Sequence, residues 1–350
     1  MFLKQLNLTN FRNYSQLELE FDSRPTVLVG GNGAGKSNLL EAIYLLSTTK
    51  SLRVETENEL IKENAEFAKI EGVVANGGET ELLIIINQPT DEVKFKKRVI
   101  VNGIPRRTVD FIGNLPAVIF YPQDINLVTG SPSLRRWHID LSLAQIDPVY
   151  KKSLTLFEQF LAARNRVLKR IREGQGKLDE LDYWTAGLIK EAKVISDKRK
   201  EFFEFINKLP KELGDFKFMY QPSELSLEKL KEANGREVAA AATLIGPHRD
   251  DLTLIMGGKN LAHFGSRGEQ RMGTLAFKLA QFEYMAHILG KRPTLLLDDV
   301  FSELDENHRR LVGEIALKQQ TIISTIEMSE IPNNLLDKAR ILQVEEGKIV

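Results

Sequence analysis

Residues 30–37 carry side-chain types whose spacing suits the binding of a phosphate chain. Their sequence, GGNGAGKS, matches the pattern G-x-x-x-x-G-K-[ST]. Glycines in such a loop let successive backbone N–H groups converge on phosphate oxygens, and the helix that follows directs its positive dipole end at the same anion. Lys36 would reach the β- and γ-phosphates, and the Ser37 hydroxyl would bind Mg²⁺. The pattern therefore predicts a P-loop that binds a nucleoside triphosphate with Mg²⁺.

The alternative is a glycine turn that merely precedes an ordinary helix. A chain of this length matches the pattern by accident about once in a hundred cases. Directly before the glycines, residues 26–29, TVLV, indicate a buried strand. After them, apolar side chains recur at helical spacing at Leu39, Ala42, Ile43 and Leu46. This context of strand, loop and helix favours nucleotide binding.

A second buried strand, which ends in two carboxylates, is indicated by residues 294–299, TLLLDD. Such a segment is typical of a Walker B motif, in which Asp298 would hold the Mg²⁺ shell. Asp299 would orient or polarise the attacking water. A strand followed by an acidic turn is the alternative, and it is the weaker one in a chain that also has a P-loop.

The segment SRGEQR, residues 266–271, precedes a helix whose apolar side chains keep a period of 3.6. One interpretation is a capping box, with Ser266 as N-cap and Glu269 three residues later, which needs no ligand. The other is that this helix N-terminus binds a phosphate through the Ser266 hydroxyl and the Gly268 N–H. The P-loop and the two aspartates favour the phosphate, and both interpretations can hold together.

Composition excludes several classes of protein. The 350 residues are 42% hydrophobic and 27% charged, as expected for a soluble globular protein with a large core and a second lobe. No apolar run approaches the ~20 residues of a membrane span, and the polar N-terminus does not resemble a signal peptide. The absence of cysteine excludes disulfides and thiolate metal sites and is compatible with a reducing cytoplasm. Because the formal net charge is zero, nucleic-acid binding would need local basic clusters.

Hydrophobic periodicity predicts the elements that position these motifs. Strands are expected over residues 2–8, 17–21, 68–76, 80–87, 93–101, 117–121 and 216–220, with a further hairpin formed by 251–256 and 260–264. From about residue 133 to 209 the pattern is helical and is broken at 174–176, which predicts an αα-hairpin. A further helix is expected around 236–242.

Together these elements predict an α/β ATPase head of two lobes. Residues 1–120 and 243–350 would form the first lobe, with the P-loop and Walker B segment, and residues 121–242 a mainly helical second lobe. The signature segment would occupy residues 264–271. Ser37 and Ser266 are too close in sequence to leave room for a long coiled coil between them.

The order of the motifs resembles the ABC-type ATPase heads, and most closely the RecF family of bacterial recombinational repair proteins. The segments that carry this resemblance span the chain: NFRNY at 10–14, GGNGAGKSNLLEAI at 30–43, SLR at 51–53, GSP at 130–132 with Arg135 and Arg136, GPHRDDL at 246–252, SRGEQR at 266–271 and LLLDDVFSELD at 295–305. The combination of GPHRDD with an Asp-Asp Walker B is far more specific than the P-loop alone.

The resemblance implies roles for individual residues. Ser266, Arg267, Gly268 and Glu269 would be the signature that contacts a partner subunit's ATP, Ser302 to Asp305 the D-loop, and Gln123 the residue that senses the γ-phosphate, beside Lys36, Asp298 and Asp299 in catalysis. The implied nucleotide contacts are Arg12, Asn13, Gly30, Gly31, Asn32, Gly33, Ala34, Gly35, Lys36, Ser37 and Asn38.

This sequence departs from the family patterns at Gln123, where many relatives carry glutamate, and at Glu269, where glutamine is frequent. The histidine that transporter ATPases place after the next strand is missing, since residues 322–325 offer only hydroxyls. These departures predict slow ATP hydrolysis.

The resemblance implies an ATP-dependent homodimer that clamps double-stranded and gapped DNA in the cytoplasm, at the nucleoid. It would hydrolyse ATP weakly with stimulation by DNA, act in DNA replication, repair and the SOS response, and help RecR and RecO to load RecA. The alternative is an ATPase subunit of a chromosome-structure or transport system, although the short middle region and the missing histidine argue against both.

Three basic clusters could contact DNA phosphates. The alternative is that they contact only solvent, as runs of charged residues more often do. The best of them lies on the first helix of the expected αα-hairpin and includes Arg166, Lys169 and Arg170, with Arg164 and Arg172. The others are Lys94, Lys96, Lys97 and Arg98, and the pair Arg106 and Arg107.

Overall fold

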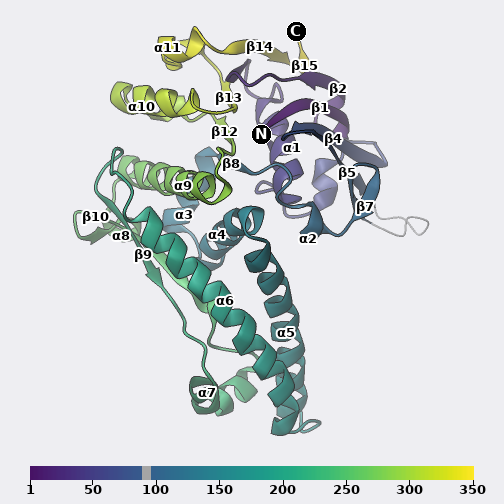
Figure 1. Cartoon of the computed structure of the whole chain (residues 1–350), viewed down its shortest axis with the longest axis vertical. Helices are drawn as coiled ribbons and strands as arrows, with labels where there is room; N and C mark the ends of the chain where they lie inside the picture. Colours follow the sequence, from purple (N-terminus) through teal and green to yellow (C-terminus); the bar gives the residue numbers. More distant parts are fainter. Residues whose placement is uncertain (89–95) are drawn as a thin grey trace. The chain divides into compact units, whose positions relative to one another are not determined.

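The computed structural model describes residues 1–88 and 96–350, so residues 93–95 of one expected strand, and Lys94, lie outside the described part. The chain divides into unit 1, residues 1–124 and 285–350, and unit 2, residues 125–284 (Figure 1). Residues 243–284 were expected in the first lobe. They belong instead to unit 2, where β10 (Asp251–Met256) pairs with β9 (Phe216–Gln221).

The centre of unit 1 is a largely parallel sheet with the strand order β15-β14-β3-β13-β12-β8. Its strands are β3 (Thr26–Val29), β8 (Ala117–Phe120), β12 (Thr294–Asp298), β13 (Thr321–Thr325), β14 (Arg340–Glu345) and β15 (Lys348–Ile349). Every residue of β3, β8, β12 and β13 is buried, which agrees with the continuous apolar runs of β3, β8 and β12, whereas β13 also buries Thr321, Ser324 and Thr325. Since β3, β12 and β13 run parallel, their carboxyl ends meet at one edge, where the P-loop and the acid pair follow.

An antiparallel sheet, with the order β2-β1-β4-β5-β6-β7, forms the rest of the unit 1 framework. Its strands are β1 (Phe2–Phe11), β2 (Tyr14–Glu20), β4 (Phe67–Ala75), β5 (Glu79–Asn87), β6 (Lys97–Val101) and β7 (Ile104–Arg106). Buried and more exposed residues alternate along β4 and β5, as expected for strands with one face on the core. The expected N-terminal hairpin is confirmed, because β1 pairs with β2.

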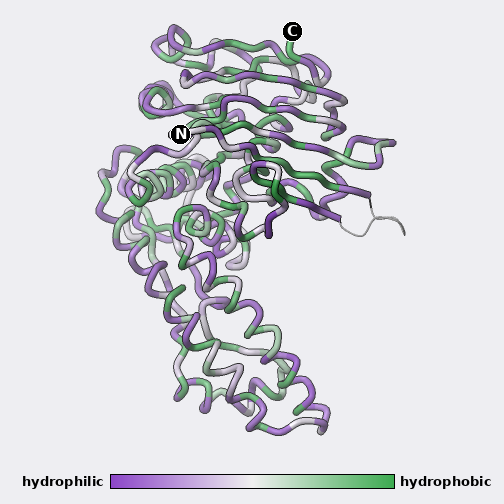
Figure 2. Tube along the Cα trace, turned by 45° about the vertical axis from the view of Figure 1, so that its right-hand side comes forward, coloured by the Kyte–Doolittle hydropathy of each residue, from purple (hydrophilic) through white to green (hydrophobic). Residues whose placement is uncertain are grey.

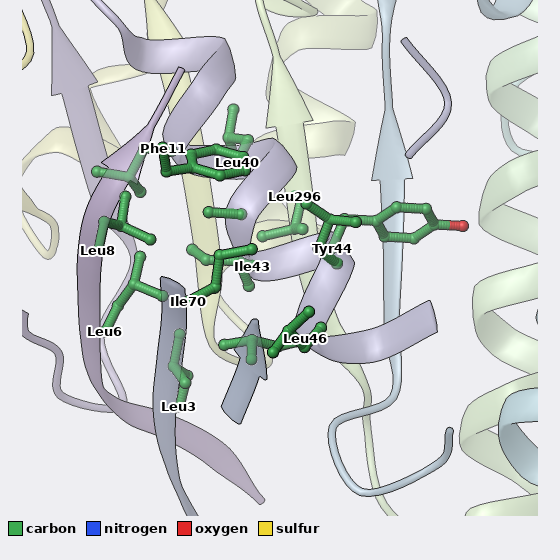
Figure 3. Close-up of a cluster of buried hydrophobic side chains, with 14 of the residues drawn as sticks. Leu3, Leu6, Leu8, Phe11, Leu40, Ile43, Tyr44, Leu46, Ile70 and Leu296 are labelled. Carbon is green, nitrogen blue, oxygen red and sulfur yellow. The ribbon is translucent and has the colours of Figure 1, made fainter. Parts of the chain in front are cut away.

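Helix α1 (Lys36–Thr48) contacts strands of both sheets. It is buried on nearly all sides, and Figure 3 shows its Leu40, Ile43 and Leu46 among side chains of the antiparallel sheet, with Leu296 of β12 nearby. A helix whose side chains are mostly apolar suits such an internal position. The P-loop is therefore anchored at both ends, by β3 before it and by α1 after it.

Unit 2 is mainly helical. Its helices include α4 (Pro132–Ile146), α5 (Pro148–Arg172), α6 (Asp182–Ile206), α7 (Leu227–Ala240) and most of α9 (Arg267–Leu289). The expected αα-hairpin is confirmed by α5 and α6, and Figure 2 shows hydrophilic and hydrophobic residues alternating along these helices. The expected helix at 236–242 is the end of the longer α7.

One predicted strand of unit 2 is wrong. Residues 260–264 were expected to pair with 251–256, but β11 (Lys259–Asn260) has only two residues and α8 (Leu261–Phe264) follows it. Asn260 causes the switch, because its side chain accepts a hydrogen bond from the N–H of Ala262 at 2.9 Å and caps this helical turn.

The GPHRDD segment at residues 246–251 lies in a buried polar network of unit 2. The Arg199 guanidinium, 2% exposed, donates to Asp250 Oδ2 at 2.7 Å and to the carbonyl of Pro247 at 2.8 Å. His248 Nε2 lies 3.0 Å from the carbonyl oxygen of Thr243, which also accepts from Arg249 at 3.3 Å. These contacts give the segment a structural role within unit 2.

Burial of His248 makes the stability of unit 2 depend on pH. Burial, assisted by the charges of Arg249 and Arg136, lowers the pKa of His248 to about 4. The unfolded chain, whose histidine titrates near pH 6.5, therefore binds a proton that the folded chain does not between pH 6.5 and 4, and the free energy of unfolding falls as the pH falls. A shift of this size is worth at most about 3 kcal/mol, and partial exposure reduces the expected loss to about 1–2 kcal/mol.

Denaturant unfolding at pH 7.5 and pH 5 measures this dependence. The variant His248→Gln should lose less stability between the two pH values than the parent does. His263→Gln, at an exposed histidine of the same unit, should keep the parental dependence. An unchanged pH dependence in His248→Gln would show that other groups cause it.

Candidate nucleotide site

The P-loop is shaped by two positions that only glycine can occupy. A Cβ atom on Gly30 would lie 2.2 Å from the carbonyl oxygen of Val344, which is backbone and cannot give way. Gly35 has a φ of 119°, and its Cβ would lie 2.7 Å from Asn13 Nδ2. Close approach at the first glycine and left-handed backbone at the second therefore fix the path of the loop.

Lys36 folds back over the loop that precedes it. Its Nζ donates to the carbonyl oxygens of Gly30, at 2.7 Å, and Gly31, at 2.9 Å. Burial lowers the pKa of Lys36, and the charges of Asp298 and Asp299 oppose this shift. An ammonium has three donors, so a phosphate oxygen can compete for contacts that the loop carbonyls now receive.

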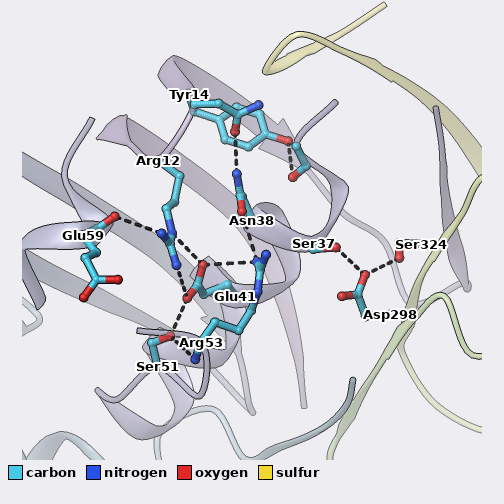
Figure 4. Close-up of polar contacts among 12 residues, drawn as sticks. Arg12, Tyr14, Ser37, Asn38, Glu41, Ser51, Arg53, Glu59, Asp298 and Ser324 are labelled. Atoms are coloured by element: carbon cyan, nitrogen blue, oxygen red, sulfur yellow. Dashed lines mark hydrogen bonds and ion pairs between the residues drawn. The ribbon is translucent and has the colours of Figure 1, made fainter. Parts of the chain in front are cut away.

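The end of β12 brings a carboxylate to the start of α1. Ser37 Oγ donates to Asp298 Oδ1 at 2.7 Å, and Ser324 Oγ, from β13, donates to the same oxygen at 2.5 Å (Figure 4). Mg²⁺ prefers oxygen ligands and often takes only one or two from the protein, completing its shell with water and phosphate. The contact between Ser37 and Asp298 thus offers a donor pair that fits Mg²⁺. In the part of the chain that the structure describes, no cluster of three or more His, Cys, Asp or Glu residues offers an all-protein metal site.

Asp299 is held in an unusual backbone conformation directly beside this pair. Its φ is 51°, and its N–H lies 3.2 Å from the carbonyl oxygen and 3.1 Å from the Oγ of Ser324. Its side-chain Oδ1 is buried and finds no hydrogen-bond partner within residues 1–88 and 96–350. Burial, followed by the charges of Glu330 and Asp298, raises the pKa of Asp299. A carboxylate oxygen without a partner is available to a ligand or a water.

Arg12 and Asn13 support the loop from the turn between β1 and β2. Arg12 pairs with both oxygens of the buried Glu41, at 3.0 and 3.1 Å. Arg53 shares this carboxylate at 3.4 Å and donates to Asn38 Oδ1 at 3.1 Å (Figure 4). Asn13 Nδ2 donates to the carbonyl of Ala34 at 3.0 Å. The segments NFRNY and SLR are therefore joined to the P-loop helix through Glu41, a residue that the sequence analysis missed.

Three further predicted site residues, Gln123, Ser302 and Asp305, differ in their surroundings. Gln123 is exposed on the 3₁₀ turn η2 (Pro122–Ile125), so its γ-phosphate role stays a prediction. In the D-loop segment, Ser302 Oγ donates to the carbonyl of Asp299 at 2.9 Å. Asp305 caps α10 (Glu306–Ala316) by accepting from the N–H of His308 at 3.0 Å. Ser302 is thus tied to the acid pair, whereas Asp305 has a local capping role.

The signature segment lies in unit 2 and forms the capping box expected from its sequence. Ser266 N–H donates to Glu269 Oε2 at 2.7 Å, and Glu269 N–H donates to Ser266 Oγ at 3.3 Å. The hydrogen bonds that glutamate accepts from the serine lower the pKa of Glu269. Glutamate therefore serves the cap well here, and the phosphate interpretation stays a prediction.

The basic cluster of the αα-hairpin is only partly available to DNA. Arg166, Lys169 and Arg170 are exposed, although Arg170 also pairs with Glu180 at 2.9 Å. Arg164, counted as a candidate, is instead buried and bonds Glu237 Oε2 at 2.7 Å. It is therefore structural.

The other two basic clusters also engage neighbouring acids. Lys97 pairs with Glu57, and Arg107 pairs with Asp110 at 2.8 Å. As for membranes, none of the described helices is long and apolar enough to cross one.

Comparison with known proteins supports the architecture. The fold matches the solved structure of the recombination mediator protein RecF-ATP in the RecFOR pathway, with a TM-score of 0.87 and 29% identity over 100% of this chain and 97% of that chain. A head domain of Smc from Pyrococcus furiosus, with a TM-score of 0.54 and 18% identity over 100% of this chain and 96% of that chain, shares the fold alone. The predicted α/β ABC-type ATPase head is confirmed.

Sequence comparison gives the family. Residues 2–348 match the family described as RecF/RecN/SMC N terminal domain. The DNA replication and repair protein RecF of Halalkalibacterium halodurans is 36% identical over 373 residues, covering 100% of this chain and 99% of that protein. The same-named protein of Oceanobacillus iheyensis is 36% identical over 372 residues, with 100% of both chains covered. The chain therefore belongs to the RecF family of DNA replication and repair proteins.

Proposed function

We propose that this chain is an ATP-dependent DNA-binding protein of recombinational repair, whose ATP-bound form is a homodimer that clamps DNA. The observation that carries the proposal is the contact of Ser37 with Asp298 beside a P-loop in which Gly30 and Gly35 have no room for a side chain. Membership of the RecF family and the similarity to a RecF structure with ATP support it.

In this proposal each residue of the nucleotide site has a stated task. Lys36 leaves the loop carbonyls for the β- and γ-phosphates, and Ser37 and Asp298 hold Mg²⁺, which would supply compensation for the phosphate charge. Asp299 orients the attacking water through its Oδ1, which has no hydrogen-bond partner among the described residues. The remaining P-loop residues, with Arg12, Asn13 and Asn38, shape the cradle, and Gln123 senses the γ-phosphate.

ATP hydrolysis is proposed to be slow and to set how long the dimer stays on DNA. Asp299 is one methylene shorter than glutamate, so it holds a water less favourably, and residues 322–325 offer only hydroxyls where transporter ATPases place a histidine. Weak, DNA-stimulated ATP hydrolysis would let the dimer stay on DNA until a partner arrives.

The dimer is proposed to place the signature of each chain against the ATP of its partner. Ser266, Arg267, Gly268 and Glu269 would then contact the partner's γ-phosphate, next to the partner's D-loop residues Ser302 and Asp305. The N-terminus of the 23-residue helix α9 supports this role, since its dipole and its first N–H groups favour an anion. A two-fold dimer would bury two ATP molecules.

The proposed substrates and partners follow from the family. They are double-stranded and gapped DNA, and RecR with RecO, which would load RecA at the gap during the SOS response. The protein would act in the cytoplasm, at the nucleoid.

DNA binding by the dimer should be sensitive to salt and stronger with ATP. Replacing Arg166, Lys169 and Arg170 together by glutamate should weaken DNA binding about tenfold or more, because these exposed cations would face DNA phosphates. Each lost phosphate contact lowers the slope of log affinity against log salt by about 0.9. Fluorescence anisotropy with gapped duplex DNA over a salt series measures both quantities.

The matched control reverses Lys190, Lys193 and Lys200, which are exposed on α6 of the same unit and change the charge equally. The control should bind DNA nearly as the parent does. If the triple variant on α5 keeps the parental affinity for DNA and the parental slope of log affinity against log salt, these three residues contact only solvent. The DNA contact then lies elsewhere.

A further inference from the structure

The αα-hairpin of α5 and α6 carries a cluster of aromatic rings, one of which is open to solvent. Tyr183, in the first turn of α6, is 70% exposed. Its ring centroid lies 5.0 Å from that of Trp184, edge to face, and 6.3 Å from that of Phe160 on α5. Tyr183 therefore presents a large ring to water, and its two aromatic neighbours leave most of that ring uncovered.

The two neighbouring rings are fixed in place by the packing of the hairpin. Phe160 fills the space beside Gly187, where a Cβ atom would lie 2.4 Å from Phe160 Cε1. Trp184 packs against a small buried cluster, whose members are Val167, Leu168 and Leu181. The exposed ring is thus supported by two helices, so a ligand that stacks on it would have little ordering cost to offset.

The exposed ring lies on the side of the hairpin that faces away from α7. On the other side, the buried Arg164 guanidinium bonds Thr185 of α6 at 3.1 Å and Glu237 of α7 at 2.7 Å. Residues two apart lie about 200° apart around a helix of 3.6 residues per turn. Tyr183, two residues before Thr185, therefore points away from this network.

The side of the exposed ring also carries two of the cations already proposed to contact DNA. Arg170 reaches from α5 to Glu180, three residues before the exposed ring, at 2.9 Å. Arg166 lies four residues before Arg170, and residues at this spacing share a helix face. The exposed acids Asp179 and Asp182 lie at the N-terminus of α6, where the helix dipole offsets negative charge. An open aromatic ring is thus flanked by two guanidinium groups.

This combination has the chemistry of sites that bind single-stranded nucleic acids, in which bases stack on aromatic rings and cations follow the phosphates. Unpaired bases can turn a face to such a ring, whereas a duplex offers only base edges in its grooves. We propose that Tyr183 is a stacking site for unpaired bases of gapped DNA, with Arg166 and Arg170 on the adjoining phosphates. The inference rests on the proposed DNA-binding function and deepens it, because it names the single-stranded segment as what the hairpin recognises.

Tyr183→Ala tests the stacking contact in fluorescence anisotropy with ATP present. With a gapped duplex whose gap holds unpaired thymidines, the variant should bind about tenfold more weakly than the parent, within the range that stacking of one base contributes. With the uninterrupted duplex, and with the same gap made of abasic residues, it should bind as the parent does. The slope of log affinity against log salt should stay parental, because stacking releases no counterions.

Two matched variants and one spectroscopic signal accompany this measurement. Tyr183→Phe keeps the ring and should keep the parental affinity. Leu227→Ala, which removes a side chain 51% exposed in the same unit, should do the same. The chain has two tryptophans, so emission in the Trp137→Phe background reports Trp184 alone. A base stacked on the adjacent Tyr183 should quench this emission, and the abasic gap should not.

Parental affinity of Tyr183→Ala for the gapped DNA would overturn the inference and would assign the exposed ring to another class of partner, such as a protein. An equal loss of affinity for the abasic gap would also overturn it, because the ring would then act on the DNA backbone or on the fold. Failure of the proposed function looks different. In that case the parent with ATP would bind none of the three DNA molecules.

Discussion

Replacing Asp299 by asparagine should slow single-turnover ATP cleavage by about 10²–10⁴-fold, the usual contribution of a general base. The side chain keeps its size, but it can no longer take the proton of the attacking water. Asp299 is prepared for this task because its backbone is fixed by Ser324 and its Oδ1 is left without a partner among the described residues. Since ATP would persist, the ATP dimer should be trapped on DNA.

Rapid-quench cleavage of labelled ATP, together with the lifetime of the dimer on DNA, measures this effect. Asp337→Asn is the control, because Asp337 is an exposed carboxylate of the same unit. It should leave both quantities at their parental values. A parent that turns over many times per second, or an Asp299→Asn variant that cleaves ATP like the parent, would remove Asp299 from this role.

Ser266→Arg should abolish ATP-induced dimers while the monomer still binds ATP. The substitution removes the serine hydroxyl and places a long side chain at the helix N-terminus that is proposed to meet the partner's γ-phosphate, so the phosphate has no room to approach the first N–H groups of the helix. Loss of the capping box with Glu269 should cost only about 1 kcal/mol, which is too little to unfold the chain. Lys36→Met should show the opposite defect, with ATP binding itself lost.

The matched control is Ser226→Arg, because Ser226 caps α7 in the same unit by accepting from the N–H of Lys229 at 3.2 Å. Ser226→Arg removes an N-cap comparable to that of Ser266, but at a helix for which no ligand is proposed. Analytical ultracentrifugation should find ATP-induced dimers for Ser226→Arg and only monomers for Ser266→Arg. Equal dimerisation of both variants would refute the assignment of the signature.

The sequence predicted well those features that depend on local chemistry. The glycines at 30 and 35 have no substitute, so the P-loop pattern predicted their backbone geometry. The capping box at Ser266 and Glu269 was likewise predicted, because a cap involves only residues three apart. Strands buried on both faces, such as β12, were visible as continuous apolar runs.

Features that depend on distant contacts could not be predicted. Glu41 joins Arg12 and Arg53 only because the β1–β2 turn and the loop after α1 meet at one helix. Arg164 was placed among DNA-binding cations, since no pattern in the sequence reveals its buried pairing with Glu237, 73 residues away.

The division of the chain between the two units also depends on strand pairing. Residues 243–284 follow the helical region and contain the signature, so sequence order suggested a return to the first lobe. The pairing of β10 with β9 instead keeps them in unit 2. Helix α9 then runs across the boundary between the units at residue 285.

Sedimentation velocity of the purified protein, alone, with ATP and Mg²⁺, and with gapped duplex DNA added, tests most directly the proposal of an ATP-controlled DNA clamp. Lys36→Met serves as the variant that cannot bind ATP. An ATP-controlled clamp should be a monomer without nucleotide and a dimer with ATP, and the parent with ATP, but not Lys36→Met, should form a dimer–DNA complex. Sedimentation as a monomer under every condition, or equal DNA binding with and without ATP, would contradict it.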